Sequence, residues 1–381
     1  MIYTDTIPDR PAGAQLRVAV ISDIHMECRT TPTSHIIDNL NHYLVNPVVF
    51  KSLDALFVTG DFWDRLVNLP NEGVWEVNEF ITRLLRLAKT HSVAVRVLEG
   101  TPKHDWKQSK MFVNINRDYG IEADLQYVDK QCIVDDITLG MTIGYIPDRW
   151  RDDVKDTTKE FKELMATRGY SEVDFMLMHG FCDFQLPRTE SEAGFDSAWL
   201  NSIVKFAVYI GHDHNAKDRG KIHIPGSFER TRHGENGPRG FIIGDIVSGE
   251  ITNHRVENTR AMPYVTYDLT DNSDDDILLM LDALLSLGQQ GYIKLRLNSK
   301  TGLRSQTSTW SRKTTAVLEV EYLTSDDVEV IDMHFTVGDN APVISADNIK
   351  KTILNETVPE SVDPAILNGE IEYIMETVGG K

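Results

Sequence analysis

The sequence predicts an α/β protein with either one mixed sheet or two sheets packed face to face, and a small second domain. Three observations lead to this prediction. In the first half of the chain, short apolar segments typical of buried strands alternate with segments of helical periodicity. The later strand-like segments follow one another without long helices between them, which disfavours a doubly wound sheet. Near residue 262 the composition changes, and a compact β-α-β pattern begins.

The elements of the larger, N-terminal part follow from the spacing of apolar residues. Residues 16–22 are an apolar segment that ends in polar residues, the pattern of a buried strand. A polar helix is expected to end at Gly169, because glycine readily adopts the left-handed conformation that ends helices. Further strands are predicted at 54–59, 93–98, 141–146, 173–178, 206–210, 222–224 and 241–246, and helices at 34–46, 75–90 and 151–168.

The rest of the chain is predicted to form a small α+β domain and a helical C-terminal segment. The acidic run at 271–276 suits a helix N-terminus, where negative charge is favourable. Two helical patterns near the C-terminus carry apolar residues that pack either on the chain's own body or on a partner. The predicted strands lie at 264–269, 292–297 and 316–323, the helices at 275–287, 345–355 and 363–377, and the domains at 1–261, 262–330 and 331–381.

Length and composition exclude several classes of protein. A chain of 381 residues is long enough for two or three domains with sizeable cores. It has no run of 18 apolar residues, so no membrane contact is expected. The N-terminus lacks the basic and apolar regions of a signal peptide, so we expect a cytoplasmic location. Three cysteines without a paired spacing predict no disulfide framework.

The formal net charge of −19 argues against a protein that coats nucleic acid with a basic surface. It does not exclude nucleic-acid chemistry at a site whose positive charge comes from bound metal ions. It also fits a protein that works beside a more basic partner.

Carboxylate and imidazole side chains follow five of the predicted strands. Sites in α/β proteins form at such strand ends. Five of the twelve histidines lie there, whereas the other seven have no such partners. In chain order, the strand-end segments contain Asp23 and His25; Asp61 and Asp64; His104 and Asp105; His179; and His212 and His214.

A mixed set of aspartate and histidine is a ligand set for divalent ions such as Mn²⁺, Fe²⁺ or Zn²⁺. The set is too large for one ion. Two ions that share a bridging carboxylate can clamp the oxygens of an in-line phosphoryl displacement and activate water, while an imidazole protonates the leaving oxygen. We expect Asp64 to lie behind the ligands or to cap a helix, rather than to bind metal.

The order DxH, GDxxD, a histidine loop, H and GHxH resembles the calcineurin-like metallophosphoesterases over about residues 16–246. The segments 225–231 (PGSFERT) and 238–241 (PRGF) resemble those of SbcCD-type nuclease subunits. The resemblance implies a two-sheet β-sandwich flanked by helices, with a DNA-capping domain after residue 262. It further implies a cytoplasmic nuclease for DNA repair, recombination or replication, with double-strand exonuclease and single-strand endonuclease activity. The implied partners are DNA, a second copy of the chain and a coiled-coil ATPase of the SbcC type.

The resemblance also implies roles for individual residues. His104 is the implied catalytic imidazole, and Asp105 the residue that orients it. The implied cofactors are two divalent ions, with Mn²⁺ expected. The first ion takes Asp23, His25, Asp61 and His214, and the second takes Asp61 as the bridge, His179 and His212.

The sequence departs from the family at one loop. The family has GNH[DE], in which the asparagine binds the second metal, whereas this chain has GTPKHD and no asparagine. Thr101 could supply a hydroxyl ligand, water could fill the position, or Lys103 could contact a substrate phosphate. Phage-encoded relatives have similar expanded loops, so the resemblance includes a phage origin.

Other interpretations stay open at this stage. Arg230 either contacts a phosphate backbone or forms a salt bridge within the acidic chain. The whole protein could instead be a phosphodiesterase for a small substrate, or a scaffold that keeps the fold but has lost catalysis.

Overall fold

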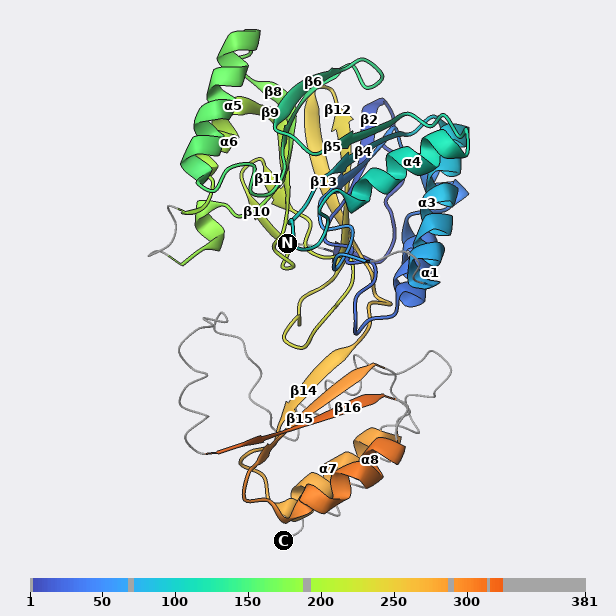
Figure 1. Ribbon diagram of the computed structural model, residues 1–381, viewed down its shortest axis with the longest axis vertical. Coiled ribbons are helices and arrows are strands. Elements are labelled where there is room, and N and C mark those ends of the chain that lie inside the picture. The colour runs from blue at the N-terminus through green and yellow to red at the C-terminus, as the bar shows by residue number, and fades with distance from the viewer. Residues whose placement is uncertain (1–2, 68–71, 188–192, 287–290, 314–315, 325–381) are drawn as a thin grey trace. The chain divides into compact units, whose positions relative to one another are not determined.

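The computed structural model describes residues 3–324, apart from 68–71, 188–192, 287–290 and 314–315 (Figure 1). The chain divides into two compact units, Met1–Tyr264 and a second unit that begins at Val265. The predicted C-terminal segment 331–381, with its helical patterns at 345–355 and 363–377, lies outside the described residues. Among the described residues, no helix combines the length and the apolar character needed to cross a bilayer.

The first unit contains two large sheets with helices on their outer faces (Figure 1). In spatial order, the first sheet contains β1 (Tyr3–Thr4), β13 (Glu250–Glu257), β12 (Gly240–Val247), β2 (Ala14–Ile21), β3 (Ala55–Thr59), β4 (Ala94–Leu98) and β5 (Leu125–Val128). The second contains β10 (Lys217–Arg219), β11 (Ile222–Ile224), β9 (Val204–Gly211), β8 (Val173–His179), β7 (Met141–Ile146) and β6 (Cys132–Asp136). The helices are α1 (Thr33–Tyr43), α2 (Pro47–Phe50), α3 (Glu72–His91), α4 (Met111–Asp118), α5 (Val154–Arg168) and α6 (Ser197–Ile203).

Three apolar clusters hold these layers together. One lies between the two sheets, where Phe57 of the first sheet meets Phe175 and Tyr209 of the second. Another packs α1, α3 and α4 on the first sheet, and a third packs α5 and α6 on the second. The strands β3 and β4 are buried along their whole length because both faces of the sheet are covered. The predicted class, a two-sheet sandwich flanked by helices, is confirmed.

The predicted strands and helices of this unit are present, with small shifts at their ends. The helix expected at 34–46 stops at Tyr43, and a separate turn of helix begins at Pro47, capped by Asn46. The helix expected at 151–168 begins at Val154, after Asp153 accepts a hydrogen bond from the next turn, and ends at Gly169 as predicted. The sequence analysis missed β1, β5, β6, β10, β13, α4 and α6, which are short or carry polar residues on one face.

The described part of the second unit is a three-stranded sheet with helices. The sheet contains β14 (Tyr264–Asp268), β15 (Tyr292–Asn298) and β16 (Val317–Leu323), and the helices are α7 (Asp274–Ser286) and α8 (Thr307–Lys313). The strand β14 begins at Tyr264, the last residue of the first unit. The acidic run predicted to begin a helix does so, because α7 opens with three aspartates. The three domain boundaries proposed from the sequence stay a prediction.

A buried ion pair joins the two central strands of the first sheet. Arg17 on β2 donates two hydrogen bonds to Asp245 on β12, at 2.7 and 2.8 Å, and both side chains are 1% exposed. Removal of one partner would leave the other charge buried without compensation.

We therefore predict that Asp245→Ala lowers the free energy of unfolding by about 3–5 kcal/mol, measured by urea denaturation. Asp118→Ala is the control, because its pair with Arg117 is exposed to solvent and its loss should leave stability nearly unchanged. Equal losses in the two variants would contradict this interpretation.

Candidate metal centre

The candidate ligands lie where parallel strands end. The strands β2, β3 and β4 are parallel neighbours in the first sheet, and β8 and β9 are parallel neighbours in the second. Their carboxyl ends therefore lie along one edge of each sheet, and the loops that follow bring the side chains of both sheets together. The six predicted metal ligands form two groups: Asp23, His25 and His214, and Asp61, His179 and His212.

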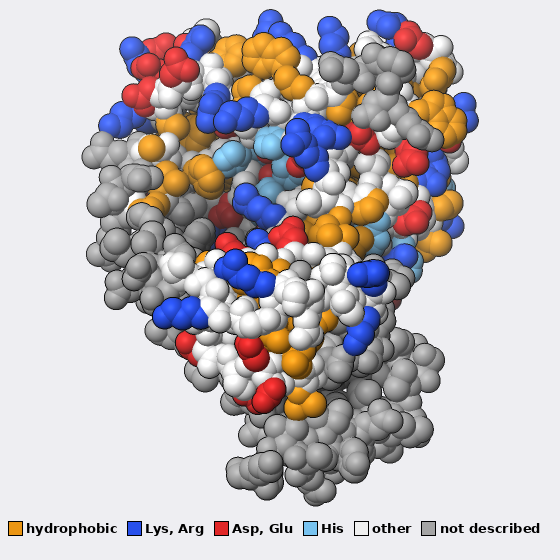
Figure 2. All heavy atoms as spheres, turned by 60° about the horizontal axis from the view of Figure 1, so that its bottom comes forward, with side chains coloured by type: hydrophobic (Ala, Val, Ile, Leu, Met, Phe, Trp, Pro, Cys, Tyr) orange, Lys and Arg blue, Asp and Glu red, His pale blue; other side chains and the backbone are white. Residues whose placement is uncertain are grey.

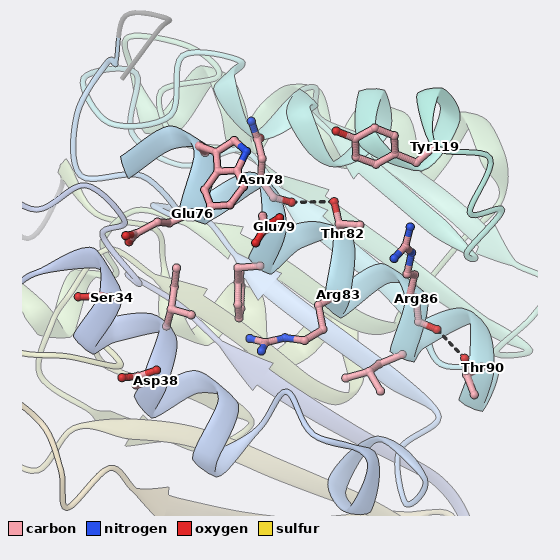
Figure 3. A pocket seen from close by; sticks show the side chains of 14 residues that line it. Ser34, Asp38, Glu76, Asn78, Glu79, Thr82, Arg83, Arg86, Thr90 and Tyr119 are labelled. Carbon is pink, nitrogen blue, oxygen red and sulfur yellow. Dashed lines mark hydrogen bonds between the residues drawn. The ribbon is translucent and has the colours of Figure 1, made fainter. Parts of the chain in front are cut away.

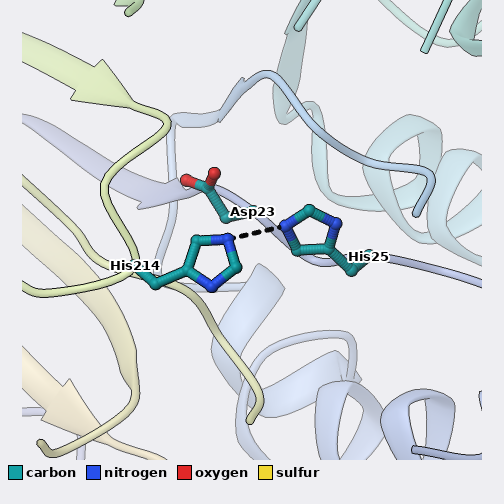
Figure 4. A group of neighbouring side chains, drawn as sticks. All are labelled: Asp23, His25 and His214. Atoms are coloured by element: carbon teal, nitrogen blue, oxygen red, sulfur yellow. Dashed lines mark hydrogen bonds between the residues drawn. The ribbon is translucent and has the colours of Figure 1, made fainter. Parts of the chain in front are cut away.

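In the first group, the ligand atoms lie within 4.8 Å of one another. Figure 4 shows the rings of His25 and His214 facing each other beside Asp23, with 2.9 Å between their Nε2 atoms. The Asp23 carboxylate also accepts hydrogen bonds from the backbone N–H of His212, at 3.0 and 3.1 Å. Two imidazole nitrogens and a carboxylate at this spacing can hold a divalent ion.

In the second group, His179 connects the two sheets. Its Nδ1 lies 2.7 Å from the carbonyl oxygen of Thr59, the last residue of β3. Since a carbonyl only accepts, Nδ1 carries the proton, and Nε2 is the atom free to bind metal. This Nε2 lies 3.2 Å from Asp61 Oδ2. Asp61 belongs to this group by distance, and its predicted role as a bridge to the first ion stays a prediction.

The hydroxyl of Thr101 lies among the ligand atoms of the second group. It is 3.1 Å from Asp61 Oδ2, 3.3 Å from His179 Nε2 and 3.1 Å from His212 Nδ1. Lys103, by contrast, is exposed. This placement favours the Thr101 hydroxyl as the substitute ligand, while the exposed Lys103 remains available for the predicted phosphate contact.

Charges within the second group shift its pKa values in opposite directions. Burial disfavours the charged forms of both His179 and Asp61. For His179, attraction to the Asp61 carboxylate outweighs burial and raises the pKa to about 10. The His179 imidazolium in turn outweighs burial and lowers the pKa of Asp61. Burial and the neighbouring His179 lower the pKa of His212. Without metal, the group is therefore an ion pair next to a neutral imidazole.

Four of the predicted ligands adopt left-handed backbone conformations. The φ angles are 49° for Asp23, 55° for His25, 49° for Asp61 and 102° for His212. Such conformations cost about 1–3 kcal/mol each for residues with side chains, and they concentrate at functional sites. The strained backbone at these four residues is consistent with a functional role for the direction in which it points their side chains.

Glycines precede several ligands because the strand ends converge closely. A Cβ atom at Gly60 would lie 2.3 Å from His179 Nδ1, and one at Gly211 would lie 2.7 Å from the same atom. A Cβ at Gly100 would lie 2.1 Å from the backbone nitrogen of Asp61. The glycines in GD, GT and GH thus allow strands from both sheets to meet around one imidazole.

Asp64 connects a metal ligand to the candidate catalytic histidine. Its Oδ1 lies 3.4 Å from His25 Nδ1, and its backbone carbonyl accepts a hydrogen bond from His104 Nδ1. The rings of His25 and His104 meet edge to face, with centroids 5.0 Å apart. Asp64 does not cap a helix, and its carboxylate forms a third possible metal-binding group with His25 and His104, so its expected place behind the ligands stays a prediction.

The prediction that Asp105 orients His104 differs from the structure. The Asp105 carboxylate is fully buried and accepts hydrogen bonds from the backbone N–H groups of Trp63, at 3.0 Å, and Gly100, at 2.8 Å. His104 and Asp105 both donate their backbone N–H to the Thr101 carbonyl, and their side chains reach different partners. Burial and the charge of Asp61 raise the pKa of Asp105 to about 7.

The structure bears on one of the two alternatives for Arg230. Its guanidinium donates to the backbone carbonyls of Glu235, Ala261 and Gly237, at 3.1, 3.2 and 3.4 Å. Among the described residues these bonds take the place of the expected salt bridge, and the expected phosphate contact stays a prediction. The neighbouring Arg232 carries the ion pair instead, 3.4 Å from Glu235.

The sequence analysis missed two acidic residues near the ligands. Glu235 is buried and accepts a hydrogen bond from His214 Nδ1, which fixes the ring with Nε2 toward the first group. That bond outweighs burial and lowers the pKa of Glu235 to about 2. Asp148 lies two residues beyond β7; its charge contributes to the raised pKa of His179 and partly opposes the lowering of the pKa of His212. The strand-end rule could have found Asp148, whereas no local pattern indicates Glu235.

Comparison with known proteins identifies no family for this chain. No protein-family model matches it, and no curated protein matches it. A solved structure of TT1561 of Thermus thermophilus is 9% identical, with a TM-score of 0.38, over 64% of this chain and 99% of the other. A second solved structure is 12% identical, with a TM-score of 0.37, over 63% of this chain and 99% of the other.

The raised pKa of His179 predicts that metal binding releases protons. A metal ligand must be a neutral imidazole, so a bound ion displaces the His179 proton at neutral pH. Between pH 6 and 8, affinity should rise about tenfold per pH unit for each proton released.

Calorimetry of Mn²⁺ binding in buffers with different ionisation enthalpies measures this proton count. The His179→Asn variant should lose at least one released proton, and the distant His42→Ala variant should lose none. An affinity that does not change with pH would contradict the proposed protonation of the site.

Proposed function

We propose that this protein is a nuclease that uses two divalent ions, with Mn²⁺ expected, to hydrolyse phosphodiester bonds in DNA. The observation that carries the proposal is the pair of adjacent Asp/His groups, with His104 beside one of them. The donor set suits borderline divalent ions, and the first group directs two Nε2 atoms at each other, 2.9 Å apart. The choice of DNA as substrate comes from the resemblance to SbcCD-type nucleases.

The chain's own residues would position the substrate and supply a proton. Bound ions would supply Lewis-acid polarisation of the phosphoryl group and of water. The Nδ1–H group of His104 donates a hydrogen bond to the Asp64 carbonyl. The other ring nitrogen, Nε2, is therefore the atom that can protonate the leaving oxygen. Asp64 thereby keeps His104 at a fixed place beside the ligand His25.

The segments behind the resemblance support a metal ligand. Ser227 donates its backbone N–H to the His214 carbonyl at 3.1 Å, and Arg239 donates a guanidinium hydrogen to the same oxygen. Glu229, fully buried, accepts a hydrogen bond from the backbone N–H of Met262. These contacts give the two segments a structural role near the candidate ligands that does not involve DNA. The proposal that DNA is the substrate therefore needs its own test.

That test is hydrolysis of end-labelled double-stranded DNA by the purified chain with Mn²⁺, Mg²⁺ or EDTA. Release of nucleotides that requires the metal supports the nuclease. Turnover of a small chromogenic phosphodiester without DNA hydrolysis favours a small-substrate phosphodiesterase. Hydrolysis of neither substrate favours a scaffold that has lost catalysis.

Two variants separate the role of the proton donor from that of the ligands. His104→Ala should lower kcat by about 10²- to 10⁴-fold while calorimetry still detects both metal sites. Asp61→Ala should lose metal and activity together, because its carboxylate is a ligand. A wild-type rate for His104→Ala, or two intact metal sites in Asp61→Ala, would contradict these assignments.

We further propose that the chain forms a homodimer through the face of α1 and α3. Figure 3 shows a groove of about 840 Å³ along these helices, lined by none of the candidate metal ligands. On this face of α3, Glu76 and Glu79 lie toward the N-terminus, and Arg83 and Arg86 toward the C-terminus. Residues 76 and 86, and likewise 79 and 83, are equally far from residue 81. If the α3 helices of two copies cross antiparallel at residue 81, Glu76 of one copy would face Arg86 of the other, and Glu79 would face Arg83. Trp75, 61% exposed, provides apolar surface beside them.

The ATPase partner stays a proposal from the resemblance alone. The segments expected to contact it, 345–355 and 363–377, lie outside the described residues.

The dimer proposal predicts a specific charge rescue. Arg86→Glu should raise the dimer dissociation constant by about tenfold or more, measured by analytical ultracentrifugation, because the introduced carboxylate would face Glu76 of the partner subunit. The double variant Glu76→Arg with Arg86→Glu should restore association. A monomeric wild-type protein, or no rescue, would contradict this interface.

A further inference from the structure

The loop after β4 presents an unpartnered tryptophan beside the candidate catalytic histidine. Trp106, two residues after His104, is 62% exposed. By comparison, the exposed Phe181 at the end of β8 packs its ring on His212, with centroids 4.3 Å apart. Within the described residues, Trp106 has no such ring contact. Its exposure leaves a large apolar surface in water, which burial against a ligand would remove favourably.

Two lysines flank this tryptophan. Lys103 and Lys107 are both exposed, and neither ammonium group forms an ion pair with any described residue of this acidic chain. By contrast, the exposed Arg232 near the ligands has a carboxylate partner in Glu235. Figure 2 shows a face on which histidine side chains are open to solvent, with lysine and arginine side chains around them. The two lysines therefore add exposed positive charge to the loop that carries His104.

Buried acceptors hold the loop in place. The Asp105 carboxylate binds the N–H groups of Trp63 and Gly100, and the Glu99 carboxylate accepts the N–H of Lys107. The Gln108 side chain donates to the carbonyls of His104, at 2.9 Å, and Arg65, at 3.0 Å. Trp106 is thus fixed between anchored residues on both sides.

The backbone of the loop is strained at Trp106 and Lys107. Trp106 has a φ of 25° and Lys107 a φ of 63°, both in the left-handed region. Residues with side chains adopt such conformations at an energetic cost, and these conformations concentrate at functional sites. The loop therefore bears strain and exposed apolar surface together, in a segment that its hydrogen bonds hold rigid.

We propose that Trp106, Lys103 and Lys107 bind a nucleotide next to the scissile phosphate, with an unpaired base stacked on the indole. This inference rests on the proposed nuclease function and specifies its substrate class. Aromatic side chains stack on any base, and lysines bind the flanking phosphates without sequence preference. Bases inside a duplex are already stacked, so the site selects single-stranded DNA or frayed ends.

The test is fluorescence anisotropy with a labelled single-stranded oligonucleotide, full-length protein and Ca²⁺ in place of Mn²⁺. Trp106→Ala should weaken binding by about 5- to 150-fold, and Trp106→Phe should keep most of the affinity. An oligonucleotide with abasic positions should bind wild type and Trp106→Ala equally, since it offers no base to stack. Circular dichroism of each variant checks that the fold is intact.

The lysines have a separate readout. The double variant Lys103→Ala with Lys107→Ala should reduce the slope of log affinity against log salt by about 1.4, at about 0.7 per charge on a single strand. Lys51→Ala is the control, because Lys51 precedes β3 and lies at the opposite end of that strand from the site. An unchanged slope in the double variant would overturn the role of the lysines.

The outcomes distinguish this inference from the proposed function. If wild type hydrolyses DNA and Trp106→Ala binds it equally well, the inference is wrong and the nuclease stands. If wild type binds DNA through Trp106 but hydrolyses none with Mn²⁺, the nuclease proposal is wrong and the binding site stands. If Trp106→Ala loses equal affinity for normal and abasic strands, base stacking is wrong.

Discussion

The hydrogen bond between the His179 ring and the Thr59 carbonyl is the interaction on which the site depends. It joins the last residue of β8 in the second sheet to the last residue of β3 in the first, at 2.7 Å. The ring can enter this position only because Gly60 and Gly211 have no Cβ atoms there. The same bond fixes the tautomer and directs Nε2 at Asp61. Sheet packing, glycine placement and ligand orientation are therefore parts of one arrangement.

Around this contact, acidic side chains orient the basic ones. Glu235 fixes the ring of His214, Asp64 lies against His25, and Asp61 pairs with His179. Without ions, Asp61 and His179 neutralise each other; with an ion bound, the imidazole would become a ligand and the carboxylate would keep its charge. Under the proposed function, bound metal ions would supply the positive charge with which so acidic a chain binds a phosphodiester.

The sequence predicted the strands and the ligand groups because both obey simple rules. Apolar runs mark buried strands, and polar residues at parallel strand ends must lie along one edge of a sheet. The roles of Asp105 and Glu235 could not be predicted in this way. Both depend on the direction of a side chain in a turn or a loop, which the tertiary contacts decide. Strands such as β13 were missed because their alternation of polar and apolar residues is weak.

The central claim is that two divalent ions bind where the strand ends of the two sheets meet. Anomalous diffraction at the manganese edge, from crystals of the full chain grown with Mn²⁺, tests it most directly. The account predicts two peaks about 3.5–4 Å apart. One should lie beside Asp23, His25 and His214, and the other beside Asp61, His179 and His212. A single peak, or peaks away from these side chains, would contradict the account.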